Sequence, residues 1–211
     1  ELLHTATLVH DDLIDGSPMR RGTPTLNATW EMPAAVLTGD FLFSQAAWLG
    51  AQVGSTDVMR MFASTLSTIV NGEITQIFER NALTDREAYI QRIYAKTASM
   101  FELAARAPAH LVGRQQEVGE VLRAFGYGIG MAFQMVDDIL DFSSDAASLG
   151  KPVASDLRLG LITLPALYFL EANPGDARLK KLQNGEQVAE KDMEALIAEI
   201  RASRAMQSAH A

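Results

Sequence analysis

Cysteine is absent from this chain of 211 residues, which excludes disulfide bonds and thiolate metal sites and fits a reducing cytoplasm. No uninterrupted apolar stretch reaches the roughly 20 residues that a membrane-spanning helix needs, and no signal-peptide pattern opens the chain. The 26 acidic residues outnumber the 18 basic ones, and the net charge of −8 argues against a nucleic-acid partner. No Ser/His/Asp arrangement indicates a covalent nucleophile. We therefore expect a cytoplasmic protein without a membrane span.

Apolar residues make up 48% of the sequence, enough for a well-buried globular core. The length suits one domain, residues 1–211. The chain starts directly on an apolar-periodic segment without a cap residue, and the stretch from Met193 to Ala211 is still helical in pattern where it stops. We therefore expect a partial domain, with further helices of the natural protein missing at both ends.

Helical patterns dominate and no convincing strand alternation appears, so the predicted fold class is all-α. Residues 84–87 resemble an N-cap with an acidic first turn, Pro108 is expected to interrupt a helix, and 173–176 is a clear turn. The predicted helices cover residues 1–15, 33–53, 56–79, 84–106, about 117 through 141, 162–171 and 187–204, with loops at 19–24 and 145–158.

One acidic pattern, D-D-x-x-D, occurs twice, at residues 11–15 (the first aspartate motif) and at residues 137–141 (the second aspartate motif). In a helix, positions i and i+4 share a face and i+1 lies about 100° round, so each motif groups three carboxylates at one end of an apolar helix. Six such groups close together would repel one another unless cations neutralised them. We interpret the motifs as two walls of a divalent-metal site.

Basic residues follow both motifs: Arg20 and Arg21 after the first, Lys151 after the second, and Lys96 on a helix between them. Magnesium is usually held by one or two carboxylates together with substrate phosphates. An acidic cavity that must bind an anion also needs cations at its rim. The combination favours metal-assisted departure of a diphosphate.

These motifs resemble those of trans-prenyl diphosphate synthases over roughly residues 1–170. The first match is Leu3 to Asp15 followed by Met19-Arg20-Arg21-Gly22. The further blocks are Gly39-Asp40-Phe41-Leu42, Lys96-Thr97-Ala98-Ser99-Met100-Phe101, Gly130 to Asp138, Leu149-Gly150-Lys151-Pro152 and Thr163-Leu164-Pro165. The resemblance implies an all-α bundle of long helices around a central cavity. It also implies a prenyltransferase that joins isopentenyl diphosphate head to tail with an allylic diphosphate, using three Mg²⁺ ions.

The same resemblance implies roles for individual residues. The direct metal ligands would be Asp11, Asp15 and Asp137, and the ligands through water or orienting residues would be Asp12, Asp138 and Asp141. The allylic diphosphate would be held by Arg20, Lys96 and Lys151, and isopentenyl diphosphate by Arg21. Thr97 and Gln134 would stabilise positive charge beside the reacting carbons. The family often has a basic residue before its threonine-leucine-proline block, whereas this chain has Gly160-Leu161-Ile162. The family residues that bind isopentenyl diphosphate upstream of Glu1 also have no counterpart here.

Product length is expected to depend on Ala6 and Thr7, which lie about one turn before Asp11 on nearly the same helix face. Members of the family that stop at short products commonly carry aromatic side chains there. Small residues leave the channel open and predict a product of more than fifteen carbons.

Two other functions stay open. A class I terpene cyclase also uses magnesium and an allylic diphosphate, but its second motif usually differs from the one repeated here. A non-catalytic subunit of a heteromeric synthase tends to lose aspartates, yet all six remain. We also expect a homodimer involving helix 33–53, transient membrane contact during product release, close helix packing at Gly126 to Gly130, and no role for Glu73 or Gln76.

Overall fold

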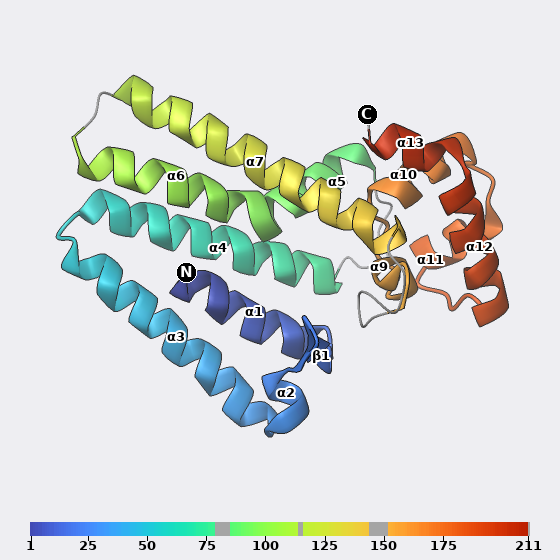
Figure 1. The fold of residues 1–211 in the computed structure, drawn as a ribbon, viewed down its shortest axis with the longest axis horizontal. Coiled ribbons are helices and arrows are strands. Elements are labelled where there is room, and N and C mark those ends of the chain that lie inside the picture. The colour runs from blue at the N-terminus through green and yellow to red at the C-terminus, as the bar shows by residue number, and fades with distance from the viewer. Residues whose placement is uncertain (79–84, 114–115, 144–151, 211) are drawn as a thin grey trace.

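The computed structural model describes residues 1–78, 85–113, 116–143 and 152–210, and it is helical almost throughout (Figure 1). The prediction of an all-α fold is confirmed. The helices are α1 (Leu2–Ile14), α2 (Leu26–Thr29), α3 (Met32–Gln52), α4 (Thr56–Phe78), α5 (Arg86–Ile93), the π-helix η1 (Tyr94–Ala98), α6 (Ser99–Leu111), α7 (Gln116–Ser143), α9 (Ser155–Arg158), α10 (Leu164–Ala172), α11 (Ala177–Gln183), α12 (Glu190–Ala202) and α13 (Arg204–His210). None of the described helices is both long and apolar enough to cross a membrane.

The long helices lie side by side, with α1 packed on α3, α3 on α4, α4 on α6, and α6 on α7. The carboxyl ends of α1, α4 and α7 all point to the same end of this bundle, at the right of Figure 1. At that end, α10, α12 and α13 pack against α7, and α11 packs on α12. Since both aspartate motifs lie in the last turns of their helices, this arrangement brings two distant parts of the sequence to one end of the molecule.

A core cluster of buried apolar residues lies where α5 and α7 meet α9 to α13. Phe142, Leu157 and Leu196 are completely buried there. Helix α10 is apolar on nearly every side, as expected for a helix surrounded by other elements. The cluster lies directly beside the end of α7, so it holds the second aspartate motif on a rigid support.

Two glycines allow α7 to approach η1 and α6 closely, as the sequence predicted. A Cβ atom on Gly126 would lie 2.6 Å from the carbonyl oxygen of Phe101, and one on Gly130 would lie 2.5 Å from Cα of Ala98. Gly72 of α4 packs in the same way, because its Cβ would lie 2.6 Å from Cβ of Ala95. Only glycine fits at these contacts, which fix α4 and α7 on either side of η1.

We predict opposite effects for two alanine substitutions in α7. Gly130→Ala should destabilise the fold by about 1–3 kcal/mol, because the backbone of Ala98 has to shift. Gly128→Ala should stabilise it by about 0.5–1 kcal/mol, because no atom lies within 4 Å of the new Cβ and alanine favours the helix. Urea unfolding followed by circular dichroism measures both changes. Equal shifts for the two variants would contradict the close-packing explanation.

Several predicted element boundaries are wrong. Pro108 does not interrupt its helix, since α6 continues to Leu111; packing along α7 offsets the hydrogen bond that proline removes. The N-cap at 84–87 is confirmed at Asp85, whose carboxylate accepts a hydrogen bond from N–H of Ala88 at 2.8 Å. The single helix predicted for 84–106 is instead divided into α5, η1 and α6. A π-helical turn holds one extra residue, which a helical repeat in sequence does not reveal.

The predicted loops also contain structure. Residues 19–24 form a short antiparallel hairpin of β1 (Met19–Arg20) and β2 (Thr23–Pro24). The loop predicted for 145–158 contains α9, while 144–151 lie outside the described residues. Helix α10 begins at Leu164, and Ser203 separates α12 from α13. Helices α2 and α11 were not predicted. These short elements depend on local contacts more than on apolar periodicity.

Candidate active site

The first aspartate motif forms the end of α1. Asp12 is buried, and its two carboxylate oxygens accept hydrogen bonds from Nε of Arg20 at 2.9 and 3.0 Å. Arg20 can reach back because the tight turn of the hairpin places Arg21 and Gly22 at φ values of 51° and 77°. The hairpin thus holds Arg20 beside the motif and leaves Arg21 exposed.

The second aspartate motif ends α7 and is held by a network of hydrogen bonds. Asp138 is buried and accepts from the Tyr89 hydroxyl at 2.8 Å and from Nε2 of Gln134 at 2.9 Å. Burial is the main reason that its pKa lies above the usual range. Asp141 accepts from N–H and Oγ of Ser155, at 3.1 and 2.8 Å, and so anchors the start of α9. Asp137 is exposed.

The π-helix η1 lies between the two motifs and carries Lys96 and Thr97. The Thr97 hydroxyl donates to Oε1 of Gln134 at 2.6 Å, which joins η1 to the network around Asp138. Nζ of Lys96 lies 3.7 Å from Oε1 of Glu73 on α4. Single π-helical turns occur frequently at functional sites, where the extra residue re-aims side chains.

The two motifs share one electrostatic environment. Burial raises the pKa of Asp11 to about 6, against the attraction of Lys96. Burial also raises the pKa of Asp156, on α9, to about 6, and the charges of Asp141 and Asp15 increase the shift. Asp141 belongs to the second motif and Asp15 to the first. Charges from both motifs thus act on the same carboxyl group, which agrees with the carboxyl ends of α1 and α7 lying at one end of the bundle (Figure 1).

Lys96 lies at the centre of this region. Burial alone would lower its pKa, but the surrounding carboxylates outweigh burial and raise it. These carboxylates come from three elements besides η1, and in order of their effect they are Glu73, Asp11, Asp15 and Asp156. Lys96 is therefore a charged ammonium that interacts with carboxylates from α4, from the end of α1 and from α9.

The six motif carboxylates divide into two groups of three. Asp12, Asp138 and Asp141 accept hydrogen bonds from neighbouring side chains or backbone groups. Among the described residues, no donor bonds to the carboxylates of the second group, which are Asp11, Asp15 and Asp137. The unbonded carboxylates are the ones that the family resemblance assigns as direct metal ligands. They remain available for a cation.

This donor set suits a hard divalent cation that brings other ligands with it. Within residues 1–78, 85–113, 116–143 and 152–210, no group of three or more His, Asp or Glu residues could by itself hold a metal ion. Magnesium typically uses one or two carboxylates and completes its octahedron with water and phosphate oxygens. The arrangement fits a metal that is held jointly by the protein and a bound diphosphate.

The remaining predicted site residues have different outcomes. Lys151 lies outside the described residues. Ala6 is completely buried and Thr7 nearly so, and the Thr7 hydroxyl donates to the carbonyl oxygen of His4 at 2.8 Å. His10 packs against Gly39 of α3. A Cβ atom added to Gly39 would lie 2.1 Å from Nε2 of His10. This contact fixes α1, and with it the first aspartate motif, on α3.

Sequence reasoning missed several residues at this end of the bundle. Glu73, expected to have no role, is the ion-pair partner of Lys96. Arg92 is partly buried and donates through Nη2 to the carbonyl oxygen of Ile162 at 2.6 Å. Tyr89 binds Asp138, and Asp156 is a further carboxylate near both motifs. Each of these contacts joins residues that are far apart in the sequence, so only the three-dimensional structure reveals it.

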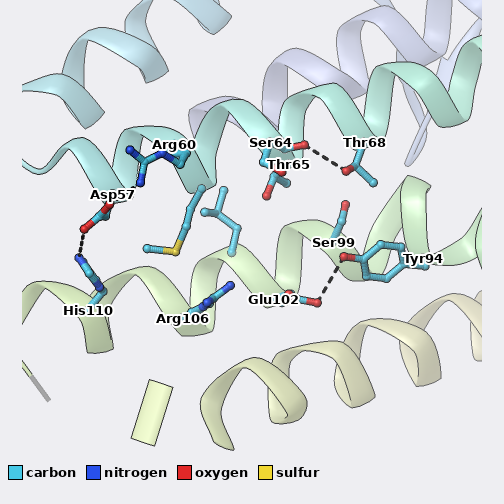
Figure 2. A pocket seen from close by; sticks show the side chains of 12 residues that line it. Asp57, Arg60, Ser64, Thr65, Thr68, Tyr94, Ser99, Glu102, Arg106 and His110 are labelled. Atoms are coloured by element: carbon cyan, nitrogen blue, oxygen red, sulfur yellow. Dashed lines mark hydrogen bonds and ion pairs between the residues drawn. The ribbon is translucent and has the colours of Figure 1, made fainter. Parts of the chain in front are cut away.

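A cavity of about 390 Å³ lies away from these aspartates, between α4 and α6 (Figure 2). Polar side chains line much of it, and several are paired with one another. Asp57 pairs with Arg60 at 2.7 Å and with His110 at 3.4 Å, and the Tyr94 hydroxyl donates to Glu102 at 3.4 Å. We place the candidate active site at the aspartate motifs, because the unbonded carboxylates and the central lysine are there.

The fold and the site together define an all-α helical bundle with two aspartate motifs at one end. The family model described as "Polyprenyl synthetase" matches residues 1–200. The chain belongs to this family.

Individual relatives agree with this membership. The all-trans-nonaprenyl-diphosphate synthase (geranyl-diphosphate specific) of Rhodobacter capsulatus is 43% identical over 179 residues, which are 84% of this chain and 55% of the relative. The chain spans about half the length of the first curated relatives that it matches.

Solved structures agree as well. Heptaprenyl diphosphate synthase from Staphylococcus aureus superimposes with a TM-score of 0.93 at 35% identity, covering 99% of this chain and 65% of that one. Polyprenyl synthase from Caulobacter crescentus, complexed with calcium and isoprenyl diphosphate, gives a TM-score of 0.89 at 34% identity, covering 99% and 64%. These structures have the same arrangement of helices as this chain.

Proposed function

We propose that the protein is a trans-polyprenyl diphosphate synthase. It condenses isopentenyl diphosphate head to tail with an allylic diphosphate and forms a product of more than fifteen carbons. One observation carries the proposal: Asp11 on α1, Asp15 at its C-cap and Asp137 on α7 accept no hydrogen bond from the described residues, and the carboxyl ends of α1 and α7 lie at one end of the bundle. The family membership and the names of the relatives support it.

Two kinds of charged side chain would bind the substrates. Carboxylates would act through metal ions, and basic side chains would act directly. Asp11, Asp15 and Asp137 would hold three Mg²⁺ ions together with the allylic diphosphate, while the hydrogen-bonded aspartates orient waters and neighbouring groups. Arg20, Lys96 and Lys151 would neutralise the same diphosphate from the protein side, and Arg21 would bind isopentenyl diphosphate. The terminal nitrogens of Arg20 suit this role, because its bonds to Asp12 use only Nε.

The reaction replaces a carbon–oxygen bond by a carbon–carbon bond. Magnesium, when bound, would withdraw negative charge from the diphosphate and favour its departure. The Thr97 hydroxyl donates a hydrogen bond to Oε1 of Gln134, so the lone pairs of the Thr97 oxygen can face the allylic cation. The double bond of isopentenyl diphosphate attacks this cation. Departed diphosphate accepts the proton whose loss restores an allylic product, so the reaction needs no side-chain base.

Incubation of the full-length protein with labelled isopentenyl diphosphate, several allylic primers and Mg²⁺ tests this function. We expect primer-dependent incorporation of label into allylic diphosphates longer than fifteen carbons. Release of hydrocarbon from the allylic diphosphate without isopentenyl diphosphate would indicate a terpene cyclase instead. Incorporation only after addition of a second protein would indicate a subunit of a heteromeric synthase.

A homodimer is proposed through α3. Leu37, Phe41 and Trp48 share one face of this helix and are 66%, 61% and 58% exposed, an apolar surface suited to self-association. The variant Leu37→Lys/Trp48→Lys should sediment as a monomer in analytical ultracentrifugation, while Leu111→Lys, at the end of α6, should sediment as the wild type does. A dimeric double variant would contradict this interface.

The location of the protein in the cell is a further part of this proposal. We propose a cytoplasmic enzyme, because the chain lacks cysteine. A polyprenyl chain is nearly insoluble in water, so release is proposed to involve transient contact with a membrane surface.

A further inference from the structure

Glu73 is the one carboxylate on α4 that faces the centre of the site. Its side chain is 12% exposed, and Oε1 lies 3.7 Å from Nζ of Lys96. The neighbouring Gly72 fixes this position, because its backbone packs directly on Ala95, the residue before Lys96. The close contact between α4 and η1 therefore sets the register in which the carboxylate meets the ammonium.

Other carboxylates also act on the charge of Lys96. Asp11 and Asp15, two of the unbonded aspartates, act on its charge alongside Glu73. A lysine ammonium is a point charge on a flexible four-carbon stem, so nothing in its own geometry selects one partner. Without Glu73, the ammonium would be drawn to Asp11. That ion pair would occupy a carboxylate needed for a cation, and it would turn Lys96 away from the anion.

We propose that Glu73 is a positioning residue that holds Lys96 away from Asp11. It keeps Asp11 available to cations and keeps the ammonium directed at the allylic diphosphate. The inference rests on the proposed function and adds a specific residue to it. Glu73 acts through Lys96 and does not itself contact the substrate.

A double-mutant cycle tests this relation. Farnesyl thiodiphosphate, an unreactive allylic analogue, is titrated into the full-length protein with Mg²⁺ in a calorimeter, which gives Kd without turnover. Glu73→Gln should raise Kd by about tenfold, the size expected when a charged group loses its partner. Lys96→Ala should raise Kd further. The double variant should match Lys96→Ala within about twofold, because a residue that acts only through Lys96 has no effect once Lys96 is gone.

Two other variants separate positioning from a structural role. Glu73→Asp keeps the negative charge and should recover part of the lost affinity. Asp57→Asn removes a carboxylate from the same helix, where Asp57 pairs with Arg60 at 2.7 Å in an exposed position, and it should leave Kd unchanged. In steady-state assays, Glu73→Gln should raise KM for the allylic substrate more than it lowers kcat. Circular dichroism melting checks that each variant is folded.

Failure of the inference about Glu73 and failure of the proposed function would give different results. A Glu73→Gln protein that binds as Asp57→Asn does would overturn the inference while the function stands. A loss of affinity that persists fully in the Lys96→Ala background would also overturn it, because Glu73 would then act directly on the metal or the fold. Absence of elongation by the wild type would overturn the proposed function and the inference with it.

Discussion

Replacing Asp11 by asparagine should lower turnover by about a thousandfold and leave the protein folded. Asp11 accepts no hydrogen bond from the described residues, and burial raises its pKa to about 6. Its charge is therefore unfavourable to the fold, and a cation is its natural partner. Asparagine keeps the shape but offers a neutral oxygen. Losing one such electrostatic contact in an active site typically costs about 10²–10³-fold in rate.

Asp12→Asn is the matched comparison for this prediction. The carboxylate of Asp12 is already bonded to Arg20, so the change should loosen the hairpin and weaken substrate binding, with a smaller loss of turnover than Asp11→Asn. Rates of label incorporation by the full-length variants, with melting temperatures alongside, give the measurement. An Asp11→Asn protein that keeps more than a tenth of wild-type turnover would sink the metal assignment and favour the non-catalytic subunit.

The sequence predicted the scaffold of this site well, because apolar periodicity marks long helices clearly. The helices predicted for 33–53 and 56–79 correspond to α3 and α4, whose limits are almost the same. Both motifs were placed on helices, and those helices end at one side of the bundle. The error at Pro108 has a physical cause. A rule about local backbone geometry was overridden by packing of α6 along α7.

The sequence alone does not reveal contacts between helices that are far apart along the chain. Glu73 lies 23 positions from Lys96, and no local pattern joins the two. The π-helical turn at Lys96 is equally hidden, and so is the bond that joins it to α7, from Thr97 to Gln134. The division of the six aspartates into bonded and unbonded groups also requires coordinates. Family resemblance had assigned the same division, but the residues alone gave no reason for it.

Ala6→Phe should shorten the product to fifteen or twenty carbons while elongation continues. Ala6 is completely buried on α1, about one turn before Asp11. The hydrocarbon tail is proposed to run from the diphosphate along this part of α1, so a phenyl ring there would block its path. Elongation stops when the growing chain meets the ring, because each added unit pushes the tail five carbons deeper. The chemistry at the aspartates, one turn away, is unchanged.

The control for this change is Thr5→Phe, which places the same ring on an exposed position of α1. Products are separated by reversed-phase chromatography and weighed by mass spectrometry. A buried phenylalanine overpacks its surroundings at a cost of about 1–3 kcal/mol, which the melting temperature of each variant monitors. Unchanged product length in a folded Ala6→Phe protein would mean that the tail follows another path. A fifteen-carbon product from the wild type would mean that small residues at this turn do not leave the channel open.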